Sequence, residues 1–217
     1  MVTKMSVIAG LSILPWAIML LTSFMKIIIV LSLLRNALGV QQTPPNQVLN
    51  GIALMLTIYV MFPTALAMYT SAQEVTVKAP TTLISPDSAA YMIAVVDKAK
   101  EPLRGFLQRN TIPAHVKSFY NLGTRLFPEP FKTQLKTTDF IILIPSFITS
   151  QLKTAFEIGV LIYLPFFVID LVVSNILLAM GMMMLSPLTI ALPIKLLLLV
   201  MVDGWTLLVQ GLALSFR

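Results

Sequence analysis

Cysteine is missing from this chain, and histidine occurs only once. Without cysteine the chain can form no disulfide, no zinc–thiolate site and no covalent haem attachment, and thiol catalysis is excluded. The single histidine, His115, stands in the most polar stretch of the sequence, which argues against a histidine-based metal site. Glycine-rich phosphate loops, Ser-His-Asp arrangements and closely paired carboxylates are also missing from the sequence. We therefore predict a protein with no catalytic residues, no metal site and no cofactor.

Charge is scarce as well. Charged residues make up 11% of the 217 positions and hydrophobic residues 57%, and the mean hydropathy is +0.89. This composition is typical of an integral membrane protein. Part of the net charge of +6 comes from residues 74–139, where nine basic and six acidic residues alternate with few aromatics among them. We interpret this stretch as solvated or facing lipid headgroups, and not as a nucleic-acid site.

Four apolar blocks cover most of the remaining chain, at residues 5–34, 48–69, 140–184 and 188–216. A helix needs about 20 apolar residues to cross the hydrocarbon core, so each block is long enough for at least one crossing. Hydropathy therefore predicts four membrane segments, or five if the third block forms two helices. The first block is longer than a signal-peptide core and has no small-x-small cleavage site, so we interpret it as retained.

The blocks divide the chain into an N-terminal apolar helical hairpin at 1–69, a small helical region at 70–139 and C-terminal apolar helices at 140–217. The predicted hairpin turn contains Pro44 and Pro45. Neither proline has a backbone donor, and the second one moves the first out of the helical region of backbone space. This pair predicts a sharp turn between two antiparallel helices.

Prolines also punctuate the middle region. Ser85 and Pro86 predict the start of a helix, with a capping hydroxyl followed by proline at the first helical position. We expect Pro102 to break that helix, and a third short helix to begin after Pro113.

Six ionisable residues interrupt the apolar blocks, where a charge is costly unless it is paired with an opposite charge or hydrated. One interpretation is a proton or ion relay, and another is ion pairing that fixes the packing of helices or subunits. Polar neighbours that would line a relay are sparse, which favours pairing; Lys153 and Glu157, four residues apart, share a helix face. A third possibility is that these helices pack within a protein assembly instead of lying in lipid. The six residues are Lys26, Lys153, Glu157, Asp170, Lys195 and Asp203.

Three consecutive methionines, Met182, Met183 and Met184, end the third apolar block, after Gly181 and before Ser186–Pro187. Methionine is flexible and polarisable, so a cluster of it can close a gap and still deform. In a membrane protein this pattern suggests a soft seal across a passage. Taken alone, the tripeptide favours the simpler interpretation of hydrophobic filler in a methionine-rich chain.

Several stretches together resemble the FliP/SctR family, the core export-gate proteins of type III secretion systems. The resemblance covers nearly the whole chain except the middle region. The matching stretches are TSFMKIIIVLSLLRNALG at 22–39, QQTPPNQ at 41–47, LKTAFEIG at 152–159, PFFVIDLVVS at 165–174, MGMMMLSP at 180–187 and LPIKLLLLVMVDGW at 192–205.

This resemblance implies an all-α membrane protein whose helical hairpins assemble into a tapered helical ring. The ring would contain five copies of the chain with two smaller export-gate proteins, SctS-like and SctT-like, and would pass unfolded proteins across the bacterial inner membrane. Much of it would protrude into the periplasm, with residues 70–139 on that side. The methionines at 182–184 would form a gasket that narrows the pore and opens around the substrate.

The resemblance also implies a partner for Lys195, which matches a lysine that pairs with an acid on a neighbouring subunit in flagellar members. Those members carry the acid at the position of Gln151, whereas this chain has Glu157 nearby, so the sequence leaves the partner of Lys195 open. Flagellar members usually begin with a cleavable signal peptide. We find none in this short chain, which favours the injectisome branch.

The sequence therefore leads to a non-enzymatic, pore-forming export subunit as the first hypothesis. The alternative from another class is a proton-coupled secondary transporter that uses Asp170, Glu157 and Lys195 as its relay.

Overall fold

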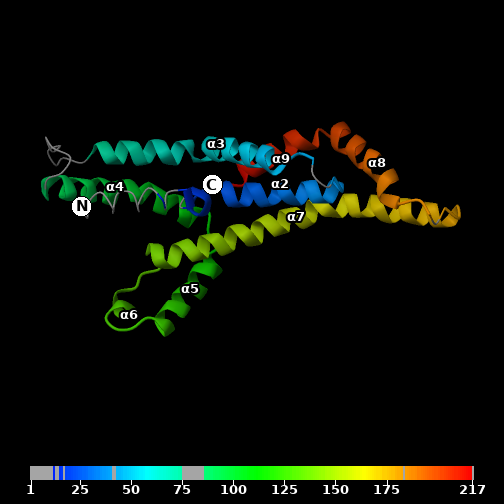
Figure 1. The fold of residues 1–217 in the computed structure, drawn as a ribbon. Coiled ribbons are helices and arrows are strands. Elements are labelled where there is room, and N and C mark those ends of the chain that lie inside the picture. The colour runs from blue at the N-terminus through cyan, green and yellow to red at the C-terminus, as the bar shows by residue number, and fades with distance from the viewer. Residues whose placement is uncertain are drawn as a thin grey trace. The chain divides into compact units, whose positions relative to one another are not determined.

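The computed structural model describes residues 12, 15–16, 18–40, 43–74, 86–182 and 184–216, and for residues 86–93 it describes the backbone only. Within these ranges the regular structure is entirely helical, which confirms the all-α prediction (Figure 1). The chain forms two compact units, residues 1–57 with 151–216, and residues 58–150. Helices α3 (Asn46–Gln73) and α7 (Phe140–Ala179) contribute residues to both.

The first unit is organised around α2 (Phe24–Leu38). Its buried residues recur with the three- and four-residue spacing of one helix face. One cluster joins this face to α3, α7 and the last helix, α9 (Gly204–Leu214), and a second joins it to α7 and to α8 (Pro187–Met201). Each large aliphatic side chain buried in this way stabilises the fold by about 1.5–3 kcal/mol. The clusters consist of Ile27, Val30, Leu31, Leu49, Ala53, Ala155 and Leu212, and of Leu34, Ala37, Leu38, Phe166 and Leu199.

The turn between α2 and α3 contains the two prolines. Gly39 ends α2 in the left-handed conformation, with φ of +78°, and its N–H bonds the carbonyl of Asn36. Arg35 then donates to the carbonyl of Pro44 at 3.3 Å and to Oδ1 of Asn46 at 2.5 Å. The start of α3 is thereby tied to the last turn of α2, and Leu49 and Ala53 reach the cluster that contains Ile27.

Helix α7 is one uninterrupted helix of 40 residues, although it contains Pro145 and Pro165. At 1.5 Å per residue it measures about 60 Å. That is roughly twice the thickness of a hydrocarbon core. By length and composition, α3 and α7 could each cross a membrane. In the described part of the chain, α8 and α9 could form a third span with a 62° bend at Val202–Asp203. The further crossing that hydropathy predicts at 5–34 falls partly outside the described residues.

The second unit contains α4 (Pro86–Arg109), α5 (Pro113–Leu126) and the short α6 (Phe131–Gln134) with parts of α3 and α7. The predicted helix after Pro113 is confirmed. The predicted break at Pro102 is wrong, because α4 continues through it. Beyond the proline, α4 buries Phe106 and Leu107, and Phe106 contacts the ring of Phe147 on α7 with 5.9 Å between ring centroids. The predicted capping residue Ser85 lies outside the described residues.

A buried hydroxyl fastens α5 to α7 in this unit. Ser150 Oγ donates to the carbonyl of Ser146 at 2.7 Å and accepts from the N–H of Ile112 at 3.0 Å. His115 Nδ1 lies 2.8 Å from the same oxygen. A hydroxyl has one proton, which here goes to Ser146, so the proton between His115 and Ser150 belongs to Nδ1.

This bond count predicts how side chains at position 115 will behave. His115→Asn keeps a donor near the place of Nδ1 and should retain the link, whereas His115→Phe and Ser150→Ala should each lower the free energy of unfolding by about 1 kcal/mol. Denaturant unfolding in detergent measures the difference, with the exposed Ser118→Ala as control. If Asn and Phe at 115 behaved alike, the proton assignment would be wrong.

Candidate functional site: the methionine loop and two buried lysines

Met182 and Met184 lie in the loop between α7 and α8. Met184 is fully exposed and Met182 is 38% exposed, while Met183 falls outside the described residues. Met180 at the end of α7 adds another exposed methionine. The loop therefore presents soft apolar side chains that the described part of this chain leaves uncovered.

The backbone ends of this loop are firmly fixed. Gly181 has φ of +72°, and its N–H bonds the carbonyl of Leu178 at 3.0 Å, while the N–H of Met182 bonds that of Leu177 at 3.0 Å. These two bonds form a Schellman motif, which needs a left-handed residue and so favours glycine. On the other side, Pro187 is the first residue of α8. The sequence thus fixes the two ends of the loop through the Schellman motif and the proline.

Lys195 on α8 is 1% exposed and ties three helices together. Its Nζ donates to Oδ2 of Asp170 on α7 at 2.8 Å and to the carbonyl of Ala37 in the last turn of α2 at 3.0 Å. That carbonyl is one of the four at a helix end that have no partner within the helix. The ammonium therefore satisfies it and also neutralises the negative end of the helix dipole. The acid partner of Lys195 within this chain is Asp170, and not Glu157.

Lys26 on α2 is 2% exposed and is held in a comparable way. Its Nζ donates to the carbonyl of Ser215, just past the end of α9, at 3.3 Å, and lies 3.5 Å from the ring centroid of Phe216. A helix carboxyl end and an aromatic face both attract a cation. Among the described residues, no carboxylate forms an ion pair with Lys26.

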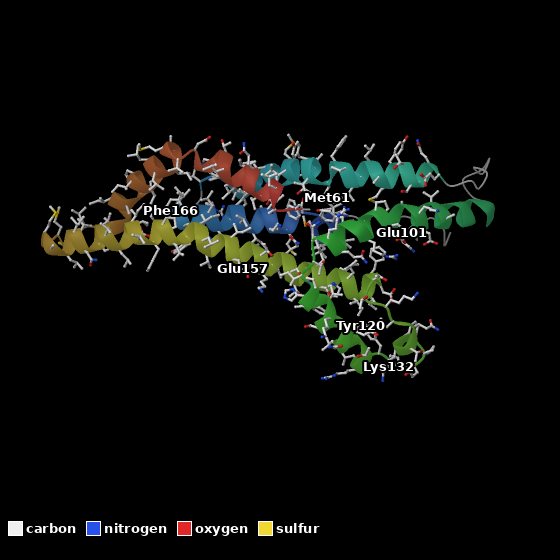
Figure 2. The ribbon with its side chains drawn as sticks, turned by 180° about the vertical axis from the view of Figure 1, so that it is seen from behind. Met61, Glu101, Tyr120, Lys132, Glu157 and Phe166 are labelled. Carbon is white, nitrogen blue, oxygen red and sulfur yellow. The ribbon has the colours of Figure 1, made fainter. Side chains whose placement is uncertain are left out.

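The other ionisable residues of the apolar blocks are exposed. Lys153 and Glu157 lie 3.7 Å apart on α7, with side chains 54% and 58% exposed, and Glu157 projects from the outer side of the helix (Figure 2). Asp203 accepts from Thr206 Oγ1 at 2.8 Å at the start of α9. Thus Glu157 and Asp170 belong to separate ion pairs. Within the described ranges, no three imidazole or carboxylate groups come close enough to hold a metal ion.

Sequence reasoning identified the lysines and Asp170 but missed the carbonyls that hold the lysines. The carbonyls of Ala37 and Ser215 carry no sequence signal, because every residue has a carbonyl. Only the positions of the helix ends show which carbonyls need a donor. Gly39 and the following prolines do mark the end of α2, and with it the place where a buried cation would be accepted.

The geometry predicts unequal effects for two lysine substitutions on the apolar helices. Lys195→Met leaves Asp170 and a helix-end carbonyl unpaired and should lower the free energy of unfolding by about 2 kcal/mol. Lys153→Met removes only an exposed pair and should cost less than about 0.5 kcal/mol. Adding Asp170→Asn to Lys195→Met should recover part of the loss, which a double-mutant cycle measured by tryptophan fluorescence in detergent would show. Equal costs for the two lysine variants would contradict a stabilising role for the buried pair.

Comparison with known proteins relates nearly the whole chain to a single family. The model of the FliP family matches residues 7–212. The chain is 49% identical over 207 residues to "Virulence protein YscR" of Salmonella typhimurium, covering 95% of this chain and 92% of that protein. It is 46% identical over 212 residues to "Yop proteins translocation protein R" of Yersinia pestis (97% and 94%). It is 44% identical over 215 residues to "Flagellar biosynthetic protein FliP" of Pectobacterium carotovorum subsp. carotovorum (99% and 78%). The chain therefore belongs to the FliP family.

Proposed function

We propose that this chain is a core pore-forming subunit of a type III protein-export apparatus in the bacterial inner membrane. Its role would be to gate the passage of unfolded proteins, without catalysis of its own. The observation that carries the proposal is the large apolar surface of the first unit. In the most apolar window of α7, only 17% of the residues are buried within the chain. Family membership gives this surface its most direct interpretation, because FliP relatives are named for translocation and flagellar biosynthesis.

The exposed apolar side chains are too many for scattered surface residues. On α7 alone they extend over about six turns, which is far more than a soluble monomer leaves uncovered. Lipid and neighbouring protein subunits are the two surroundings that would bury them. The α7 side chains are Phe156, Val160, Leu161, Tyr163, Leu164, Phe167, Val168, Leu171, Val172, Ile176 and Leu178.

An assembly of copies would bring several methionine loops together. We propose five copies with two smaller proteins, SctS-like and SctT-like, as the family resemblance implies. Met182, Met183 and Met184 of each copy would then face a shared axis and form a gasket. Methionine suits this task because its three rotatable bonds let it fill an irregular gap and move aside. Residues 70–139 would lie on the periplasmic side.

The injectisome is the branch that we favour for this chain. Its relatives include a protein named for virulence and one named for Yop translocation, and the chain covers 92% and 94% of them. The flagellar relative is 44% identical. We propose virulence effectors as the exported class.

The alternative, a proton-coupled transporter, finds less support in the geometry. A relay would need Asp170, Glu157 and Lys195 to be linked through hydrogen bonds. Instead, Lys195 contacts Asp170 and a backbone carbonyl, while Glu157 pairs with Lys153 on the exposed side of α7. These contacts serve packing better than proton transfer.

The gasket can be tested by shortening its side chains. Replacing Met182, Met183 and Met184 with alanine should leave a gap and let small ions leak through the resting assembly. Replacing them with leucine should keep the seal, because the volume is similar. The matched control is Met55→Ala, which removes a side chain that is 72% exposed on α3. The measurement is ion conductance of the purified assembly in planar bilayers.

Unchanged ion conductance in the triple alanine variant would contradict the gasket proposal. The subunit role has a separate test, because the native mass of the assembly reports on it directly. A monomer or dimer would favour the transporter, whereas a large hetero-oligomer supports the export gate.

A further inference from the structure

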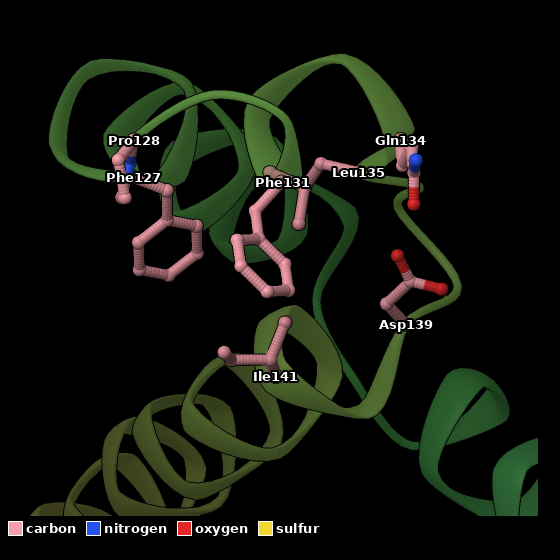
Figure 3. Close-up of a pocket in the computed structure, with 7 residues that line it drawn as sticks. All are labelled: Phe127, Pro128, Phe131, Gln134, Leu135, Asp139 and Ile141. Atoms are coloured by element: carbon pink, nitrogen blue, oxygen red, sulfur yellow. The ribbon is translucent and has the colours of Figure 1, made fainter.

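The second unit contains an open apolar pocket of about 600 Å³ where α5, α6 and the start of α7 meet (Figure 3). The rings of Phe127 and Phe131 extend toward Ile141, which forms the opposite wall. Phe131 is 68% exposed and Ile141 58% exposed, so the described part of the chain does not cover them. The pocket is therefore a ready-made place for an apolar side chain from outside.

One charged residue lines this pocket. Asp139 stands at its edge, where Oδ2 accepts from the N–H of Lys136 at 2.7 Å, and its carbonyl accepts from Ile142 and Leu143 in the first turn of α7. These bonds hold the carboxylate in place. Among the described residues, no cation forms a salt bridge with it. An occupant that carries a basic group beside an apolar one would fit the pocket best.

The outer face of α5 offers that combination on the same chain. Leu122 and Leu126, four residues apart, are 51% and 68% exposed, and Arg125, which precedes Leu126 in the sequence, is also exposed. Gly123, between the two leucines in the sequence, packs against the rest of the unit, where an added Cβ would lie 3.0 Å from Leu135 and 3.1 Å from Ile142. The described part of the chain therefore leaves both leucines and the arginine uncovered.

We propose that this leucine–arginine face of one copy docks into the Phe127–Phe131–Ile141 pocket of the next copy, with Arg125 paired to Asp139 of the neighbour. In the ring of copies proposed above, this contact would run head-to-tail, from each copy to the next. Head-to-tail contacts between identical chains close into rings when the rotation allows it. This inference rests on the proposed assembly of several copies, and it adds a specific contact between the second units of neighbouring copies.

The chain lacks cysteine, which makes a cross-linking experiment unambiguous. Two differently tagged copies are expressed together with the other export components, one carrying Leu126→Cys and the other Ile141→Cys. Mild oxidation of the membranes should give a disulfide-linked dimer that contains both tags, because this bond needs Cα atoms within about 7 Å. The control replaces Leu126→Cys with Val96→Cys, a position on α4 that is 59% exposed. It should give no mixed dimer.

Charge reversal then tests the ion pair. Arg125→Glu should reduce the cross-linked fraction about two- to fivefold, the usual range for an exposed pair. Asp139→Arg in the Ile141→Cys copy should restore it. Lys98→Glu, the same charge change on the exposed side of α4, should have no effect.

Three results would overturn the inference while the native mass shows that the assembly is intact. They are no mixed dimer, a Leu126–Leu126 dimer as in a two-fold contact, and cross-linking of Leu126→Cys only to a different protein. Loss of the assembly from the wild-type membranes would instead contradict the proposed function, so the two failures can be told apart.

Discussion

A buried ammonium at the carboxyl end of a neighbouring helix is the interaction on which the first unit depends. In an apolar setting, the last carbonyls of a helix have no water to bond, and a lysine has no water to solvate its charge. Placing one against the other removes both costs. Lys195 does this at the end of α2, and Lys26 does it at the end of α9. The first lysine also has Asp170, while the second has the ring of Phe216.

These two contacts fix α2 near both of its ends. They therefore determine which faces of the surrounding helices remain exposed to other molecules. Between the lysine contacts, α2 buries Ile27, Val30, Leu31 and Leu34 completely or nearly so. The helices around it place one side on α2 and leave the other uncovered, as the exposed residues of α7 and α8 show. The chain thus has a small apolar interior, held at its ends by two lysines, and large exposed apolar faces. Such a chain is suited to burial in a larger assembly or in lipid.

The sequence predicted the helical class and the helix after Pro113, because each depends on local chemistry. It did not predict that α4 would pass Pro102. A proline inside a helix costs about 3 kcal/mol. Burial of Phe106 and Leu107 one turn further on offsets that cost. Nor could it identify the carbonyls that hold Lys26 and Lys195, since those depend on which helix ends meet in three dimensions. The sequence therefore identified the candidate residues, but it could not identify the backbone groups that they contact.

The methionine loop combines a backbone held at both ends with methionine side chains that can rotate. Its two Schellman bonds and the proline at the start of α8 restrict the backbone on either side. Movement of the loop as a whole would break those bonds, whereas rotation of the methionine side chains breaks none. A seal of this construction would open by rearranging its side chains around whatever passes, and close when they return. In the proposed gasket, Lys195 would keep the two helices that carry the loop together during such a rearrangement, because it joins α8 to α7 and α2.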